Sequence, residues 1–331
     1  MAGVRRVSMS MSRVRSKIKP MAAGRGTARV EIRALQHREE LRECERIQRA
    51  VWGTLAVSSE TLTVTARYGG AVLGAIVKGR IVGFIYAFLA RWHGRLVHWS
   101  HLMAVEASYR DLGLGYRLKL AHRRLALDQG LEAICWTYDP LQSRNASLNL
   151  ARLGGTVYEY LPDCYGRFRS RIEKGLPSDR FVVDWKIGSA VVDRRIRGLD
   201  DAPKNLGAAV VNETRIEAGG FLKNRTIRLG MREPRLLVEI PSNTDLMRRR
   251  ALALGRRWRL ETRKIFSHYF SAGYRVDDFI SPAAASEGRC YYVLRRTRAV
   301  APLYERRNTR GGKGAAPFQG RLRAALQHLA T

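Results

Sequence analysis

The chain has 331 residues, and its 45% apolar and 8% aromatic content is typical of a globular protein with a sizeable core, which excludes a fully disordered chain. The formal net charge of +31 raises the question of nucleic acid as a partner. Much of that charge lies at the ends, because residues 1–30 carry eight Lys and Arg with no acid and residues 295–331 carry nine with only Glu305. We therefore expect basic, disordered tails at 1–29 and 298–331. Solvated tails on a basic enzyme are preferred over nonspecific binding of nucleic acid by these tails.

Cysteine usage and targeting signals favour a cytoplasmic protein. The first thirty residues, rich in Arg and Ser, also fit a transit peptide, and Met21 is an alternative start, but no apolar segment typical of secretion follows Arg5-Arg6. The one membrane-like window, 71–90, is interrupted by Lys78-Gly79-Arg80, so we expect no membrane partner. Four cysteines lie far apart without a C-x-x-C pair, which argues against a zinc cage or a disulfide framework: Cys44, Cys135, Cys164 and Cys290.

The patterns of the first half predict a mixed α/β unit. A helix over Glu39–Val51 is followed by a polar loop and a hairpin of two apolar strands, 71–77 and 81–90. The third strand, Arg95–Val105, mixes polar and apolar residues in a way that suggests a strand lining a site. A helix from Gly113 to Gln129 leads to a parallel strand beside the third strand, in one crossover unit. The strands and helix that follow the crossover helix are expected at Leu131–Tyr138, Ser143–Leu153, Thr156–Leu161 and Phe181–Ile187.

A second segment begins after residues 188–202, which are charged and lack periodicity. A strand at Leu236–Ile240 leads through a capping region to a long helix that ends near Ser271. Two strands follow, at Arg275–Ile280 and Cys290–Arg295. This α+β extension over 188–297 is expected to extend the first sheet or to pack against it, and its element order faintly echoes the first segment.

Residues Arg110 to Gly115 read Arg-Asp-Leu-Gly-Leu-Gly, between a predicted strand and an amphipathic helix. Backbone N–H groups at a helix N-terminus bind a pyrophosphate, and glycine permits the close approach and the backbone angles that this requires. The same glycines also suit a turn that merely lets helix and strand pack, and the loop alone does not separate the two. It is not a dinucleotide fingerprint, because only two glycines match.

Several separated motifs resemble the GNAT superfamily of acyl-CoA-dependent N-acyltransferases over roughly Val30–Trp185. They are Leu102-Met103-Ala104-Val105 leading into Tyr109–Gly115, the strand Leu131–Tyr138, and Asn145 through Gly154. A narrower similarity is to a poorly characterised bacterial and archaeal branch, in Gln48–Gly53, Ser100–Met103, Trp136–Leu141 and Ser178–Arg180. The resemblance implies a GNAT-like mixed, mostly antiparallel twisted sheet flanked by helices over 30–187, and it favours the phosphate-binding interpretation of the loop.

The resemblance also implies where acetyl-CoA or another acyl-CoA would bind. In such folds the third and fourth conserved strands splay apart, and the pantetheine fills the gap like an added strand. The backbone of Met103 and Val105 would contact the pantetheine, and Asn145 would touch its side. The position of Lys119 and Arg123 on the helix after the loop, and not the resemblance, suggests that they reach the adenosine end. The residues expected around the pyrophosphate are Arg110, Asp111, Leu112, Gly113, Leu114, Gly115 and Tyr116.

Acyl transfer to an amine requires a base for the amine, and His101 is the first candidate. It lies four residues before Val105, an offset that resembles the proton-relaying histidine of arylalkylamine acetyltransferases, although a histidine satisfied within a strand is an equal alternative. His98 is the second candidate. Its odd separation from His101 places the two on opposite faces, and no carboxylate lies close in sequence, so we expect no metal at His93, His98 and His101.

The general acid is less clear. The superfamily tyrosine, four residues before the terminal glycine of the Asn-led helix, is replaced here by Leu150, which cannot donate a proton. Tyr165 is the preferred substitute, because it lies in a loop that could cover the site, and Tyr138 and Tyr160 are others. Asp139 is expected either to bind a substrate ammonium or, by slight preference, to cap the following helix. In the second segment Trp258, Arg259, Glu261 and Arg263 recur around a helix at surface-like spacing. Glu261 and Arg263 are expected to form an ion pair within the helix, and a site for a substrate carboxylate is the less favoured alternative.

The sequence therefore predicts an N-acyltransferase that moves an acetyl or other acyl group from acyl-CoA to a primary amine of a small molecule or amino acid. A homodimer is possible. Two alternatives remain open: a GNAT-shaped protein that binds coenzyme A without catalysis, motivated by Leu150, and a basic RNA-associated protein.

Overall fold

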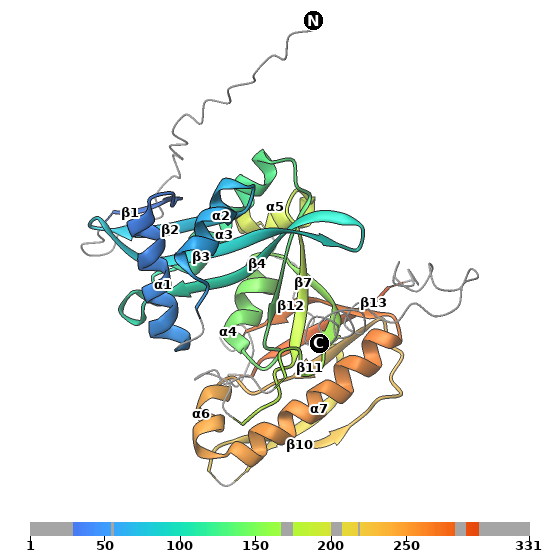
Figure 1. The fold of residues 1–331 in the computed structure, drawn as a ribbon. Coiled ribbons are helices and arrows are strands. Elements are labelled where there is room, and N and C mark those ends of the chain that lie inside the picture. The colour runs from blue at the N-terminus through green and yellow to red at the C-terminus, as the bar shows by residue number, and fades with distance from the viewer. Residues whose placement is uncertain are drawn as a thin grey trace, which may run out of the picture.

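The computed structural model describes residues 29–53, 56–166, 175–199, 207–217, 219–281 and 289–297, so the predicted basic tails lie almost wholly outside the described residues. One mixed sheet of eleven strands runs through this part of the chain in the order β1-β2-β3-β4-β5-β7-β6-β12-β13-β11-β8 (Figure 1). Its pairings are antiparallel except for β4 with β5 and β11 with β8. The predicted fold class, a mixed and mostly antiparallel sheet flanked by helices, is confirmed.

The first half of the chain supplies seven strands and four α-helices of the described residues. They are β1 (Val30–Ala34), α1 (Arg38–Trp52), α2 (Ser59–Arg67), β2 (Ala71–Val77), β3 (Arg80–Trp92), β4 (Arg95–Val105), a 3-10 turn (Ala107–Tyr109), α3 (Leu114–Asp128), β5 (Ala133–Tyr138), α4 (Ser143–Ala146), the π-helical turn η2 (Ser147–Arg152), β6 (Thr156–Leu161) and β7 (Arg180–Lys186).

Helices cover both faces of β1 to β4, because alternate residues of these strands belong to different clusters of buried side chains. Val72 and Phe84 pack with α1 and α2, whereas Leu73 and Val82 pack with Leu118 of α3. The period-2 alternation of a strand thus places α1 and α2 on one face and α3 on the other. Every residue of β2 is buried, as expected for a strand covered on both sides.

The second half continues the same sheet. Its elements are α5 (Ala190–Arg197), β8 (Ala209–Val210), β9 (Asn212–Ile216), β10 (Leu222–Ile227), β11 (Arg235–Glu239), α6 (Thr244–Arg250), α7 (Leu252–Ser271), β12 (Tyr274–Ile280) and β13 (Tyr291–Arg296). Strand β12 pairs with β6 of the first half through Val276 and Val157. Of the two predicted arrangements, the extension therefore continues the first sheet, and α7 lies along the lower part of the molecule in Figure 1.

The two halves repeat one unit around the β6–β12 pair. In the first half the order along the sheet is β5-β7-β6, and in the second it is β12-β13-β11, the same strand–helix–strand–strand unit in reverse. Each unit also has a parallel strand on its outer side, β4 beside β5 and β8 beside β11. The sequence echo between the segments is thus a structural repeat.

Several expectations about local elements were wrong. The polar loop before β2 contains α2, and the aperiodic stretch after residue 188 contains α5. Each of these helices is short and begins at a serine, Ser58 or Ser189, whose hydroxyl accepts a hydrogen bond from a backbone N–H of the first turn. The long helix ending at Ser271 is two helices, separated at Ala251.

Among the described residues, no helix is both long enough and apolar enough to cross a bilayer.

Candidate functional site

Strands β4 and β5 pair over only two residues of each and then separate. The parallel register joins His98 to Ile134 and Trp99 to Cys135, and no further pairs follow. On its other side β4 stays paired with β3 up to Val105. The edges of β4 and β5 beyond the last pair are therefore not joined to each other. Such edges present backbone N–H and C=O groups that can pair with an extended, amide-bearing ligand.

A β-bulge interrupts β4 at the start of this gap. Tyr86 of β3 lies opposite Leu102 while the adjacent Ala87 lies opposite Ser100, so His101 is the extra residue. A bulge turns a side chain out of strict alternation, and bulges are common beside active sites. Here it places His101 against the rings of Tyr86 and Phe88, on the face covered by α1 and α2. Because part of its surroundings is apolar ring rather than water, desolvation lowers the pKa of His101.

His98 lies on the opposite face, as predicted. Its Nδ1 is 3.0 Å from Nε2 of His122 on α3, and its Nε2 is 2.8 Å from the carbonyl oxygen of Gly69. These contacts occupy both ring nitrogens, so His98 is not a second base candidate. Among the described residues, no cluster of three His, Cys, Asp or Glu side chains has the spacing to hold a metal ion.

The predicted pyrophosphate loop follows β4 and opens α3. Asp111 and Gly113 both adopt the left-handed backbone conformation, with φ of +68° and +71°. A Cβ at Gly113 would meet nothing within 4 Å, whereas one at Gly115 would lie 3.4 Å from Cε of Met103. The first intrahelical hydrogen bond is donated by Arg117, to Gly113. The N–H groups of the first turn thus have no intrahelical acceptor, and the open space lies at the turn that precedes them.

A cavity of about 320 Å³ lies between the α4–η2 segment and two serines of the second half, Ser242 and Ser281, and Arg144 in its lining contacts the loop. Its lining includes two arginines, Arg144 and Arg152, with Ser147 between them on the α4–η2 segment. Arg144 also forms an ion pair with Asp111 of the loop, and the guanidinium of Arg152 lies 4.2 Å from the ring centre of Tyr116. Two cations and a hydroxyl beside a helix N-terminus suit an anionic ligand. Asn145 is exposed on the same short helix, α4.

Tyr165 lies at the β5 edge of the gap, whereas His101 lies at the β4 edge. Its hydroxyl is 3.1 Å from Oγ1 of Thr137, which lies two residues past the last paired residue of β5, as His101 lies two residues past that of β4. The alternation of β5 places Thr137 on the same face as Cys135, which packs with Val97 and Trp99 of β4. The base candidate and the acid candidate therefore flank one end of the gap on one face of the sheet.

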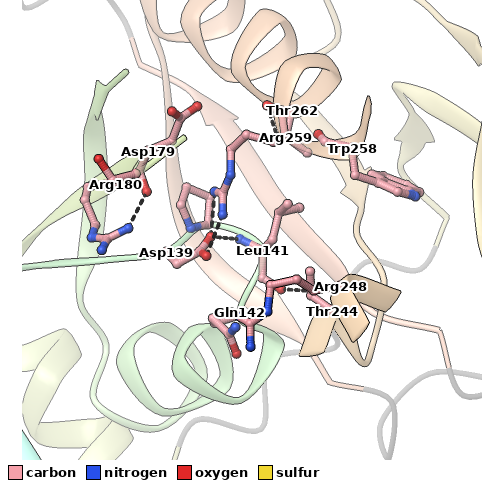
Figure 2. A network of polar contacts seen from close by, with 12 residues as sticks. Asp139, Leu141, Gln142, Asp179, Arg180, Thr244, Arg248, Trp258, Arg259 and Thr262 are labelled. Carbon is pink, nitrogen blue, oxygen red and sulfur yellow. Dashed lines mark hydrogen bonds and ion pairs between the residues drawn. The ribbon is translucent and has the colours of Figure 1, made fainter. Parts of the chain in front are cut away.

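Asp139 forms an ion pair where the two halves of the chain meet, as Figure 2 shows. Both of its carboxylate oxygens accept hydrogen bonds from Arg259 of α7, at 2.6 and 2.5 Å, and one also accepts from the N–H of Leu141 at 2.8 Å. Arg259 is only 1% exposed. Neither role considered for Asp139 agrees with this geometry: its charge is neutralised by Arg259, and the N–H of Leu141 lies in the turn before α4, whose N-terminal cap is Gln142.

The other tyrosine candidates belong to the same junction. The hydroxyl of Tyr160 donates to Asp179 at 2.6 Å, and Asp179 in turn pairs with Arg263. The hydroxyl of Tyr138 donates to Tyr292 of β13 at 3.4 Å. Leu150 lies fully inside the core. Tyr165 is thus the tyrosine candidate that the structure leaves beside the gap.

Neither Lys119 nor Arg123 points toward an adenosine position, which corrects that expectation. Arg123 donates to the carbonyl oxygen of Ile187 and to Asp193 of α5. Lys119 is 2% exposed, with its Nζ 3.1 Å from the hydroxyl of Ser100. The spacing of the apolar residues of α3 did not indicate this, because Lys119 is one residue, about 100° around the helix, from Leu118. Arg144 and Arg152 were also missed, although their spacing with Ser147 places them along one side of a helix.

Comparison with known proteins finds one family model that matches part of the chain. Residues 30–154 match the family model described as the acetyltransferase (GNAT) family. An acetyltransferase of the GNAT family from Streptococcus pneumoniae is 17% identical over 47% of this chain and 98% of its own, with a TM-score of 0.39. Naa50 of Arabidopsis thaliana, solved with the bisubstrate analogue CoA-Ac-MVNAL, is 16% identical over 47% and 97%, with a TM-score of 0.37.

An aminoglycoside acetyltransferase from an uncultured soil metagenomic sample is 18% identical over 35% of this chain and 82% of its own, with a TM-score of 0.32. A search of curated proteins finds no match to this sequence.

Proposed function

From the GNAT acetyltransferase domain that the chain carries at residues 30–154, we propose that this protein transfers an acetyl or other acyl group from acyl-CoA to a primary amine of a small molecule or amino acid. The observation that carries the proposal is the gap between β4 and β5, which ends at the glycine loop of α3. A pantetheine in this gap offers its amides to the free strand edges, while its pyrophosphate meets the N–H groups of the helix.

The contacts around the loop support a phosphorylated donor. Gly113 leaves open space above the turn, and two cations contact the loop and the first turn of α3, Arg144 at Asp111 and Arg152 at Tyr116. Both positive side chains come from the segment that follows β5, so they flank the gap from the side opposite β4. The proposed donor contacts are the backbone of Met103 and Val105, the loop from Arg110 to Tyr116, and Asn145.

The chemistry proposed at the other end of the gap is direct attack of the amine on the thioester carbonyl. His101, neutral at pH 7 because its pKa is lowered, accepts the proton that the amine loses when the N–C bond forms. The acceptor approaches on the face that holds Tyr86, Phe88 and Tyr165, since these side chains surround His101 and the β5 edge. Aromatic walls with few charges suit the apolar part of a small amine.

The donor half of the proposal is tested by calorimetric titration of acetyl-CoA into matched variants. Leu112 lies in the loop and is 58% exposed, and Leu260 lies on α7 and is 49% exposed. Leu112→Glu places a carboxylate beside the pyrophosphate and is expected to weaken acetyl-CoA binding at least tenfold through charge repulsion. Leu260→Glu adds the same charge far from the loop and is expected to leave the affinity unchanged.

The acyl-transfer half is tested by mass spectrometry of the full chain incubated with a mixture of acyl-CoAs and an amine library. Formation of an acylated amine, lost in Gly115→Glu, supports the proposal. Saturable acetyl-CoA binding without any product in the library would instead favour a coenzyme A-binding protein without catalysis. Absence of saturable binding to wild-type protein would contradict the proposal altogether.

A further inference from the structure

Lys119 is a buried cation with no acidic partner among the described residues. It is 2% exposed on α3, its Nζ donates to Ser100 Oγ at 3.1 Å, and the ammonium lies 3.5 Å from the ring centre of Trp136. A hydrogen bond to a hydroxyl and a contact with an aromatic ring replace only part of the solvation free energy that an ammonium loses on burial. A lysine kept in such a place at a cost in stability is a candidate for a role in chemistry.

The position of Lys119 is the closed end of the gap between β4 and β5. Its two contacts, Ser100 and Trp136, are the first residues past the last paired residues, Trp99 and Cys135. Gly115, one helical turn earlier on α3, packs beside Met103, farther along β4 toward the glycine loop. The inward face of α3 therefore runs from the phosphate loop at the open end of the gap to the Lys119 ammonium at its closed end.

We propose that Lys119 is the general acid that protonates the departing coenzyme A thiolate. The inference rests on the proposed function, because a pantetheine that enters at the loop carries its thioester toward the closed end of the gap. The amine nitrogen bonds to the carbonyl carbon and gives its proton to His101. The C–S bond then breaks with its electron pair on sulfur, and the Lys119 ammonium transfers one proton to that sulfur, leaving a thiol and a neutral amine. The amine regains a proton from water when the gap empties.

The charged and titratable groups around Lys119 leave it able to donate. The titratable groups that interact with it are His122 of α3 and Cys135 of β5, and His98 of β4 lies against His122. Burial lowers the pKa of both histidines and raises that of the thiol, so all three favour the neutral form. Burial also lowers the pKa of Lys119 itself, to about 7. Proton transfer to a thiolate runs downhill, because an ordinary thiol has a pKa of about 8.5.

The inference also accounts for Leu150. The position where the resemblance places a proton-donating tyrosine holds a leucine that is fully buried in the core. Leu150 and Trp136 belong to the same buried cluster, and Trp136 carries the Lys119 ammonium on its ring. The proposed donor of this chain therefore lies on α3, at the closed end of the gap, and not on the helix after β5.

Three variants of the full chain test the inference: Lys119→Met, Lys119→Arg and, as a control on the exposed side of α7, Lys264→Met. With acetyl-CoA and an accepted amine, Lys119→Met and Lys119→Arg are expected to lower kcat about 100-fold or more and to change acetyl-CoA affinity less than threefold. Arginine keeps the charge but does not release a proton near neutral pH. Wild-type kcat is expected to fall as pH rises through about 7, and this alkaline limb is expected to vanish in Lys119→Met.

Several outcomes would overturn the inference while the proposed function stands. Full activity of Lys119→Arg would show that only the charge is needed, and an unchanged pH profile in Lys119→Met would show that the lysine is structural. If both variants fail to fold, a wild-type kcat that is flat between pH 6 and 9 contradicts the inference by itself. Failure of wild-type protein to bind acetyl-CoA would instead remove the proposed function.

Discussion

His101, the residue that we propose accepts the amine proton, is positioned by the bulge in β4 and by two aromatic neighbours, Tyr86 and Phe88. We expect His101→Gln to lower kcat by about 100-fold or more, because glutamine keeps the size and polarity of the side chain but cannot accept the amine proton. Acetyl-CoA affinity should stay within threefold of wild type. Steady-state kinetics with calorimetry check this, and unchanged kcat would show that His101 only packs in the strand.

The protonation of His101 predicts how kcat changes at acid pH. The pKa of His101 is lowered by desolvation, so the neutral, proton-accepting form persists below pH 6.5. The acid limb of kcat should therefore lie below pH 6.5 and should disappear in His101→Gln. A limb centred above pH 7 in the wild-type protein would contradict this environment.

Lys119 has a further consequence, for stability. Its pKa falls from 10.5 to about 7 on folding, so the folded chain loses a proton that the unfolded chain keeps between these values. The penalty of burying the charge is fully present below pH 7 and is relieved as pH rises toward 10.5. Lys119→Met should raise the free energy of unfolding by about 1–3 kcal/mol at pH 6 and by much less at pH 9. Urea denaturation at the two pH values measures it, and a loss of stability at pH 6 would contradict it.

At the scale of elements, helix α7 is tied to the end of β5 by the pair of Arg259 and Asp139 (Figure 2). Arg259→Met should cost about 3–5 kcal/mol, because it leaves a largely buried carboxylate without its partner. Asp139→Asn should cost a similar amount, and the double variant should recover a large part of either loss. Urea unfolding of the three variants gives the coupling, and additive losses would show that the pair contributes little.

Much of the element order could be read from the sequence, because the strands of the first half are covered on both sides and carry long apolar runs. The predicted strands at 71–77 and 95–105 match β2 and β4 in both bounds. Helices α2 and α5 could not be read in this way, since each is short and only Ser59 and Leu62, or Val192, are buried. Strands β9 and β10 pair only with each other and lack an apolar pattern.

The candidate site also contains parts that could be predicted from the sequence and parts that could not. The glycine loop was predictable, because it is a short continuous segment and its glycines favour one backbone conformation. The bulge at His101 was not, since an extra residue shows only against the partner strand. The residues that contact Asp139 and Lys119 could not be predicted from the sequence. Arg259 lies 120 residues from Asp139, and the contact of Lys119 with Ser100 depends on how α3 is rotated over the sheet.

At the scale of the whole molecule, the two halves share one core. Trp258, Phe266 and Tyr269 of α7 belong to the same buried cluster as Phe181 and Trp185 of β7. A fragment of residues 30–187 would lack α7 and would expose Phe181 and the edge of β6 that pairs with β12. We expect it to aggregate, as judged by soluble yield and size-exclusion chromatography, whereas removal of residues 298–331 should have no such effect. A monodisperse fragment that binds acetyl-CoA would show that the first half folds alone.

The repeat around β6 and β12 has a consequence for stoichiometry. Between the parallel strands β4 and β5 the first unit carries a glycine loop and α3, whereas between β8 and β11 the second carries the hairpin β9–β10. If the repeat arose by gene duplication, one copy has kept the glycine loop that we propose binds the donor, and the other has become scaffold. The chain should accordingly bind one equivalent of acetyl-CoA at saturation. The second unit is expected to stabilise the first and not to add a second binding site.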